Sequence, residues 1–225
     1  MPALVDASDN LRSALSKNAL LALAESFQFL RVEQLRRYIE PSAPTHPSGS
    51  HPQLLDVLLR RATCEKRFLR DAAVFAVDQA IAFQASPELL ASAARYAASK
   101  SAKVVALASR ILAQGLLRLQ RQSAASLQVL VDDHKLLITL CQALARFRVG
   151  KDSVARQESL ACFTALGELL GRPQLETTLQ TALPEQPHDV ASIMNDAFAT
   201  AHQQKSHSGR RGSLRDRVLA VHQER

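Results

Sequence analysis

Few residues in this sequence are spaced in a way that would support catalysis or metal binding. Asp132, Asp133 and His134 are consecutive, so they point in different directions on a helix or its cap, and no further cluster converges with them. An aspartate at such a position is more typical of a helix N-cap, and His188 and Asp189 likewise follow a proline at a predicted helix start. The sequence contains no Gly-rich phosphate loop, no G-x-S-x-G, no H-E-x-x-H and no kinase signature. We therefore expect a protein that is not an enzyme and that needs no cofactor or metal.

The three cysteines give no sign of a disulfide framework or a zinc site. Cys64, Cys141 and Cys162 are odd in number and lack C-x-x-C spacing. Such usage suits a reducing compartment, and we interpret Cys141 and Cys162 as small apolar residues of the core. The N-terminus lacks the basic segment of a secretory signal, and no apolar run approaches the roughly 18 residues of a spanning helix. These observations predict a soluble cytoplasmic protein without membrane insertion.

Positive charge is concentrated near the C-terminus. The formal net charge is +7, and residues 204–225 hold six Lys or Arg against two acidic residues. The basic side chains of this segment are Lys205, Arg210, Arg211, Arg215, Arg217 and Arg225. Gly, Ser and His accompany them, so the segment buries little apolar area and we expect a mobile tail. Its charge favours polyanionic surfaces, with a strong dependence on salt.

The elements that position these side chains are predicted to be helices. Hydrophobic residues make up 47% of the chain and are mostly Ala and Leu, with no Trp, which favours helices over an all-β fold. Asp9 is suited to N-cap a long amphipathic helix that runs to about Leu30, and a basic amphipathic segment follows at residues 32–39. Residues 41–50 are rich in Pro, Ser and Gly and predict a surface loop.

From residue 53 onward the apolar pattern predicts helices in pairs. The predicted pairs are 53–61 with 68–83, 87–98 with 102–119, and 134–148 with 154–170, followed by helices at 174–181 and 188–201. Ser86 followed by Pro87 is the arrangement of an N-cap and a first helical turn.

Some of the predicted helices share a register in which an apolar residue is followed four positions later by Ala. The pairs are Leu15/Ala19, Leu69/Ala73 and Val104/Ala108, whereas Val154 is followed by Glu158. The four apolar residues recur at intervals of 54, 35 and 50 residues, near the roughly 40 to 47 of HEAT and armadillo repeats. We therefore predict an all-α fold, an α-solenoid of about three and a half HEAT/armadillo-like hairpins over residues 8–203, with an inserted loop at 41–50 and a basic tail at 204–225.

Three stretches of the chain resemble successive repeats of a TOG domain. They are Asn10-Leu-Arg-Ser-Ala-Leu-Ser-Lys-Asn-Ala19, Leu58-Leu-Arg-Arg-Ala-Thr-Cys-Glu-Lys-Arg-Phe-Leu-Arg-Asp71 and Ser99-Lys-Ser-Ala-Lys-Val104. The ending Leu179-Gln-Thr-Ala-Leu-Pro184 is similar to the segment that closes such domains. The crescerin group, the TOG array regulators of axonemal microtubules, is the most similar, followed by CLASP proteins. The resemblance covers roughly residues 8–200 and corresponds to the C-terminal half of a TOG domain.

The resemblance implies a tubulin-binding function. In TOG domains the loop inside each hairpin lies on one edge and presents basic side chains to tubulin. By position, the residues that would do so here are Arg12, Lys17, Lys66, Arg67, Lys100, Lys103 and Lys151. Repeated geometry would place equivalent loop charges in a row, where their fields add. The implied partners are tubulin and microtubules, with other cytoskeletal or ciliary proteins, and the implied location is the cytoskeleton or a cilium.

The chain also departs from the TOG pattern. Its repeats begin at what corresponds to the second helix of the third repeat, and it lacks the loop Trp that docks on tubulin in the family's early repeats. Aromatic anchors often dominate interface energy. We therefore expect weaker attachment to the microtubule lattice, aided by the basic tail, rather than tight binding to free tubulin.

The composition is also compatible with partners other than tubulin. The pI of about 9.8 permits nucleic-acid binding, but no aromatics are interleaved with the basic residues and no recognition module is present, so specific binding is not expected. The amphipathic segment at residues 32–39 is too short for a membrane-surface role. A HEAT-type scaffold that binds another protein instead of tubulin would have much the same sequence.

Overall fold

The computed structural model describes residues 1–10, 12–39, 53–122 and 124–208, and within these ranges it contains helices and no strand. The all-α prediction is therefore confirmed. The helices are α1 (Pro2–Ser8), α2 (Ser13–Ser26), α3 (Val32–Ile39), α4 (Leu54–Ala62), α5 (Arg67–Gln84), α6 (Pro87–Ala94), α7 (Ala102–Gln122), α8 (Ala124–Asp132), α9 (His134–Val149), α10 (Ser153–Leu170), α11 (Arg172–Ala182) and α12 (Pro187–Ser208), with a 3₁₀ turn, η1 (Arg95–Ala98), after α6.

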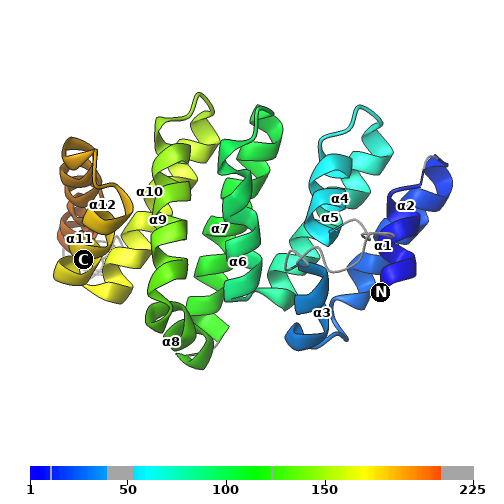
Figure 1. The fold of residues 1–225 in the computed structure, drawn as a ribbon, viewed down its shortest axis with the longest axis horizontal. Helices are drawn as coiled ribbons and strands as arrows, with labels where there is room; N and C mark the ends of the chain where they lie inside the picture. The colour runs from blue at the N-terminus through cyan, green and yellow to red at the C-terminus, as the bar shows by residue number, and fades with distance from the viewer. Residues whose placement is uncertain (11, 40–52, 123, 209–225) are drawn as a thin grey trace, which may run out of the picture.

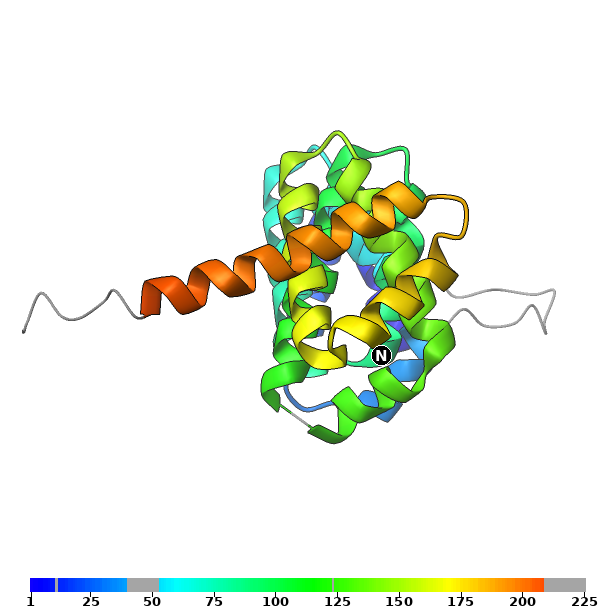
Figure 2. The ribbon, with the colours of Figure 1, turned by 90° about the vertical axis from the view of Figure 1, so that its left-hand side faces the viewer.

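The helices form antiparallel hairpins that stack side by side from the N-terminus to the C-terminus (Figure 1). The hairpins are α1/α2, α4/α5, α6/α7, α9/α10 and α11/α12. Their first helices make one layer and their second helices another, as the end view in Figure 2 shows. The two remaining helices, α3 and α8, connect successive hairpins at the edge opposite the turns within hairpins (Figure 1). The predicted α-solenoid is confirmed.

The number of hairpins predicted from the sequence was too small. The described residues form five hairpins rather than three and a half. Asp9 does not N-cap a long helix: its backbone N–H donates to the Val5 carbonyl at 3.2 Å, so it ends α1, and α2 begins only at Ser13. Helices α1 and α8 were not predicted as separate helices.

Several helix starts follow the predicted capping chemistry. The Ser86 hydroxyl accepts from the Leu89 N–H at 3.3 Å, with Pro87 in the first turn of α6. The Asp133 carboxylate accepts from the Leu136 N–H at 2.9 Å at the start of α9. These two N-caps are confirmed, and Asp152 caps α10 in the same way.

The predicted small-residue register holds in three helices and shifts in the fourth. Ala19, Ala73 and Ala108 are buried between helices. In α10 the buried small residues are instead Ala155 and Ser159, one position later than the Val154/Glu158 pair. The Ser159 hydroxyl donates to the Leu144 carbonyl at 2.7 Å and so ties α10 to α9.

The C-terminal boundary also differs from the prediction. Helix α12 continues past residue 203 and through Lys205 to Ser208, because no Gly or Pro interrupts the chain before Gly209. The remaining tail residues predicted to act electrostatically, Arg210, Arg211, Arg215 and Arg217, lie outside the described residues, as does the predicted loop at 41–50.

Candidate functional site

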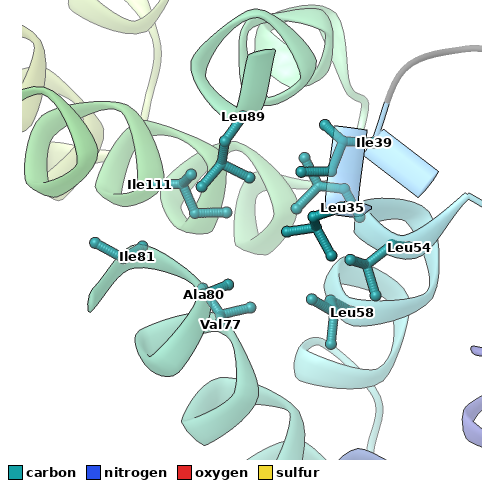
Figure 3. Close-up of a pocket in the computed structure, with 10 residues that line it drawn as sticks. Leu35, Ile39, Leu54, Leu58, Val77, Ala80, Ile81, Leu89 and Ile111 are labelled. Carbon is teal, nitrogen blue, oxygen red and sulfur yellow. The ribbon is translucent and has the colours of Figure 1, made fainter. Parts of the chain in front are cut away.

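The core of the described chain is closely packed where α3 meets the second and third hairpins. Figure 3 shows the junction of the second and third hairpins, where Leu35 and Ile39 of α3 point toward apolar side chains of α4 to α7. The space left between them is about 10 Å³ and entirely apolar, at most the volume that one water needs. In the part of the chain that the structure describes, no three His, Cys, Asp or Glu side chains gather as a metal site. No described helix is long and apolar enough to cross a membrane.

The turns within the first four hairpins lie along one edge of the molecule, at the top of Figure 1. We call this the turn edge and define it by the predicted basic residues that lie in or beside those turns. All of them are exposed: Arg12, Lys17, Lys66, Arg67, Lys100, Lys103 and Lys151. Arg12 and Lys17 belong to the α1–α2 turn and the start of α2, whereas the others surround the starts of α5, α7 and α10. The structure therefore brings the predicted residues to one side of the fold.

The cations of the turn edge differ in their contacts. Lys66 Nζ donates to Ser13 Oγ at 2.6 Å, which joins the second turn to the first. Arg67 forms an exposed pair with Asp71 at 3.6 Å. Within the described ranges Lys100, Lys103 and Lys151 have neither an ion pair nor a side-chain hydrogen bond. No described side chain pairs with them, so their charges are available to a partner.

Two further arginines near this edge have a structural role that sequence reasoning missed. The carboxylate of Asp9 pairs with Arg60 at 3.0 Å and with Arg61 at 3.3 Å. Arg61 also donates to the carbonyls of Ser8 at 3.0 Å and Asn10 at 3.1 Å, just after α1. These contacts fasten the first hairpin to the second. No local pattern could reveal them, because the partners are about 50 residues apart in the sequence.

Exposed apolar residues lie among the cations of the turn edge. Leu15 of α2 is 45% exposed, Phe68 of α5 is 43% exposed and Val154 of α10 is 49% exposed. Each is the second or third residue of its helix, so these side chains recur from hairpin to hairpin as the cations do. Sequence reasoning placed them on helices but did not show that they remain uncovered.

The basic character stops at the fifth turn. The turn between α11 and α12 carries exposed Glu185, and the first turn of α12 contains Asp189. The turn edge is therefore basic over the first four hairpins and acidic at the last.

A charge ladder crosses the layer of second helices below the turn edge. Arg110 of α7 pairs with Asp78 of α5 at 2.7 Å. On its other side Arg110 interacts with Glu158 of α10: burial raises the pKa of the Glu158 carboxyl, and the positive charge of Arg110 opposes that rise. Glu158 therefore breaks the small-residue register because it faces a cation on the neighbouring helix.

Comparisons with known proteins show no family to which the chain belongs. No protein-family model and no curated protein matches the chain. An engineered protein solved by the Northeast Structural Genomics Consortium is 13% identical, with a TM-score of 0.38 over 88% of this chain and 94% of that one. A designed armadillo repeat protein is 15% identical, with a TM-score of 0.32 over 88% of this chain and 98% of that one. The comparisons identify no TOG, crescerin or CLASP relationship.

Proposed function

We propose that the turn edge binds an acidic protein surface, and that this partner is tubulin in microtubules, as the resemblance to TOG domains implies. The observation that carries the proposal is the row of exposed cations from four successive turns on one edge of the solenoid (Figure 1). Lys100, Lys103 and Lys151 contribute most directly, because no side chain of the described protein neutralises them. The function is binding, without a catalytic step.

The physics of such an edge favours a repetitive acidic partner. One exposed ion pair contributes about 0 to 1 kcal/mol, so a single lysine binds little. Charges in a row add their fields, and a polymer lattice holds many equivalent sites at high effective concentration. Binding of this kind weakens as salt rises, because the Debye length falls to about 8 Å at physiological ionic strength.

The turn edge also offers exposed apolar side chains that a partner can bury, in addition to its charges. Phe68 lies beside Lys66 and Arg67, and it is exposed enough to enter a shallow pocket of the partner. Together with Leu15 and Val154 on the same edge, Phe68 would exclude water from the ion pairs formed with the partner. A role on axonemal microtubules, and hence a ciliary location, is part of the proposal only through the crescerin resemblance.

Microtubule co-sedimentation across a salt series tests the proposal. The test variant carries Lys100→Glu, Lys103→Glu and Lys151→Glu, and leaves out Lys66 and Arg67 because Ser13 and Asp71 already contact them. The matched control carries Arg31→Glu, Arg121→Glu and Lys135→Glu, three exposed residues at helix ends away from the turn edge. Both variants change the net charge equally, so the control removes the effect of charge alone.

We expect the test variant to bind at least roughly tenfold more weakly, because three ion pairs of up to about 1 kcal/mol each become repulsive, while the control binds nearly as wild type does. Circular dichroism should remain helical for both. Equal losses in the two variants would mean that any cation serves and that the turn edge is not a site.

A specific observation favours a second candidate, a HEAT-type scaffold for another protein. Phe75 and Phe83 of α5 are exposed on the second-helix layer, below the turn edge. Partly exposed aromatic side chains are enriched in protein interfaces. If the wild type fails to pellet with microtubules even at low salt, the scaffold becomes the better interpretation.

A further inference from the structure

Helix α5 carries a row of half-exposed phenylalanines. Phe68 is 43% exposed, and Phe75 and Phe83 are each 44% exposed. Their spacing of seven and eight residues places them on one side of the helix, about two turns apart. Phenylalanines elsewhere in the described chain include Phe27, Phe147 and Phe163, which are fully buried. Phe29, after α2, is a single ring that is 84% exposed, whereas α5 carries three exposed phenylalanines on one helix face, which we call the α5 ridge.

The charged groups beside the α5 ridge are already paired within the chain. Asp71 pairs with Arg67, and Asp78 pairs with Arg110. Arg118 Nε donates to the Ala82 carbonyl at 3.1 Å. A face with an aromatic row and neutralised charges has the composition of an interface core rather than of an ordinary solvent-exposed surface.

The neighbouring helices leave the α5 ridge accessible. Helix α5 lies in the second layer between α2 and α7 (Figure 1), and the exposed residues of α2 include Ala14, Leu15 and Ala22 as well as Lys17, Asn18 and Glu25. Helix α12 extends past the second layer, but only at the far end of the array (Figure 2). Among the described residues, nothing covers Phe75.

We propose that the α5 ridge binds a second copy of this chain, with the two α5 helices antiparallel about a twofold axis at Phe75. In this arrangement residues equally far from Phe75 in the sequence meet across the axis. Phe68 then meets Ala82, Arg67 meets Phe83, and Asp71 meets Gln79. The contacts are apolar on apolar, cation on aromatic and acid on amide, with the two Phe75 rings stacked at the centre.

The alternative orientation of the same two helices is disfavoured by charge. Parallel helices would place Asp71 on Asp71 and Arg67 on Arg67, and like charges that face each other oppose association. The antiparallel arrangement removes both repulsions. The sequence of α5 is thus self-complementary in one direction only.

The surface available is sufficient for a dimer. Helix α5 has 18 residues and is therefore about 27 Å long. Neighbouring helices are spaced about 10 Å apart, so α2, α5 and α7 together form a face about 30 Å wide. The area of this face is about 800 Å² per partner, which is the usual size of a specific interface. In this arrangement the twofold axis runs across the three helices, so α2 of one copy lies on α2 of the other and α7 lies on α7.

The dimer would present its two turn edges in opposite directions, and it would cover Arg67 and Phe68, which the α5 ridge and the turn edge share.

Sedimentation velocity over a range of protein concentrations tests the proposal. We expect a monomer–dimer equilibrium for the wild type and a dissociation constant raised at least about 30-fold by Phe75→Asp, the effect of a central hot-spot residue. Val129→Asp is the control, because Val129 is an exposed aliphatic residue on α8. A wild type that stays monomeric at all concentrations, or a dimer that persists in Phe75→Asp, would overturn the proposal.

Disulfide crosslinking locates the interface independently. In a Cys64→Ser background, Phe75→Cys should form an intermolecular disulfide on mild oxidation, since a residue on a twofold axis faces its own copy. Val129→Cys in the same background should remain largely monomeric. Crosslinking at residue 129 but not at residue 75 would place the dimer interface elsewhere and exclude the α5 ridge.

Discussion

At the scale of single residues, the three cysteines differ in their chemistry because they differ in burial. Burial raises the pKa of the Cys141 thiol to about 12, and burial together with the Glu158 carboxylate raises the pKa of Cys162 further. The thiolate is the reactive form, so both side chains should be inert at pH 8. Cys64 is partly exposed beside the α4–α5 turn.

We predict that Ellman's reagent titrates one thiol in the native protein and three after denaturation. Rapid reaction of more than one native thiol would mean that α9 and α10 open readily.

Arg60 and Arg61 both contact Asp9, but we expect them to contribute differently to the stability of the protein. Arg61 is mostly buried and joins the Asp9 carboxylate to two backbone carbonyls, whereas Arg60 is exposed and contacts Asp9 alone. Hydrogen bonds from charged groups contribute about 1.5 to 3 kcal/mol when partly buried, while an exposed ion pair contributes about 0 to 1 kcal/mol. We expect Arg61→Ala to lower the free energy of unfolding by about 2 kcal/mol and Arg60→Ala to change it by less than about 0.5 kcal/mol. Urea titration of both variants measures the difference, and equal values would show that the carbonyl contacts do not stabilise the first hairpin.

At the scale of elements, α3 fills the junction between the second and third hairpins. Leu35 is buried there among apolar residues of the surrounding helices (Figure 3). Truncating a buried leucine costs about 2 to 5 kcal/mol, according to how far the site collapses. We expect Leu35→Ala to destabilise the protein in this range, and Glu33→Ala, an exposed residue of the same helix, to have little effect. A cost below about 1 kcal/mol for Leu35→Ala in thermal or urea unfolding would mean that α3 packs only loosely on the array.

At the scale of the whole molecule, charge lies both on the turn edge and in the C-terminal segment. Residues 209–225 contain five arginines and two acidic residues. Deleting them should weaken microtubule binding at low salt and matter less at physiological salt, because the attraction of their excess positive charge to an acidic partner is screened as salt rises. The turn-edge variant should retain its defect at both salt concentrations. Co-sedimentation of the two proteins at both ionic strengths tests this, and a reversed pattern would assign binding to the C-terminal segment.

The sequence could predict features that depend on near neighbours in the chain. Helix α3 has the predicted bounds, α5 differs from its prediction by one residue at each end, and Ser86 and Asp133 cap their helices as expected. The helical period and the N-caps depend on residues that are close together in the sequence, so a local pattern can predict them. The cations of the turn edge were instead proposed from the TOG resemblance, and Arg12 and Lys17 lay within a predicted helix rather than in a predicted turn.

Only the tertiary structure decided which side chains meet and which remain uncovered. Asp9 resembled an N-cap in the sequence, but it ends α1 and binds arginines that lie about 50 residues away in the chain. Phe75 is as apolar as the buried Phe163, yet it is exposed because no helix of the described chain covers that face of α5. Burial depends on which helices stack against a given face, and that packing joins segments distant in sequence. The amino-acid sequence by itself therefore determined most of the helices, several of their caps and the basic residues near the turns. The stacking of hairpins decided the ion pairs of Asp9 with Arg60 and Arg61, the alignment of the turn edge and the exposure of the α5 ridge.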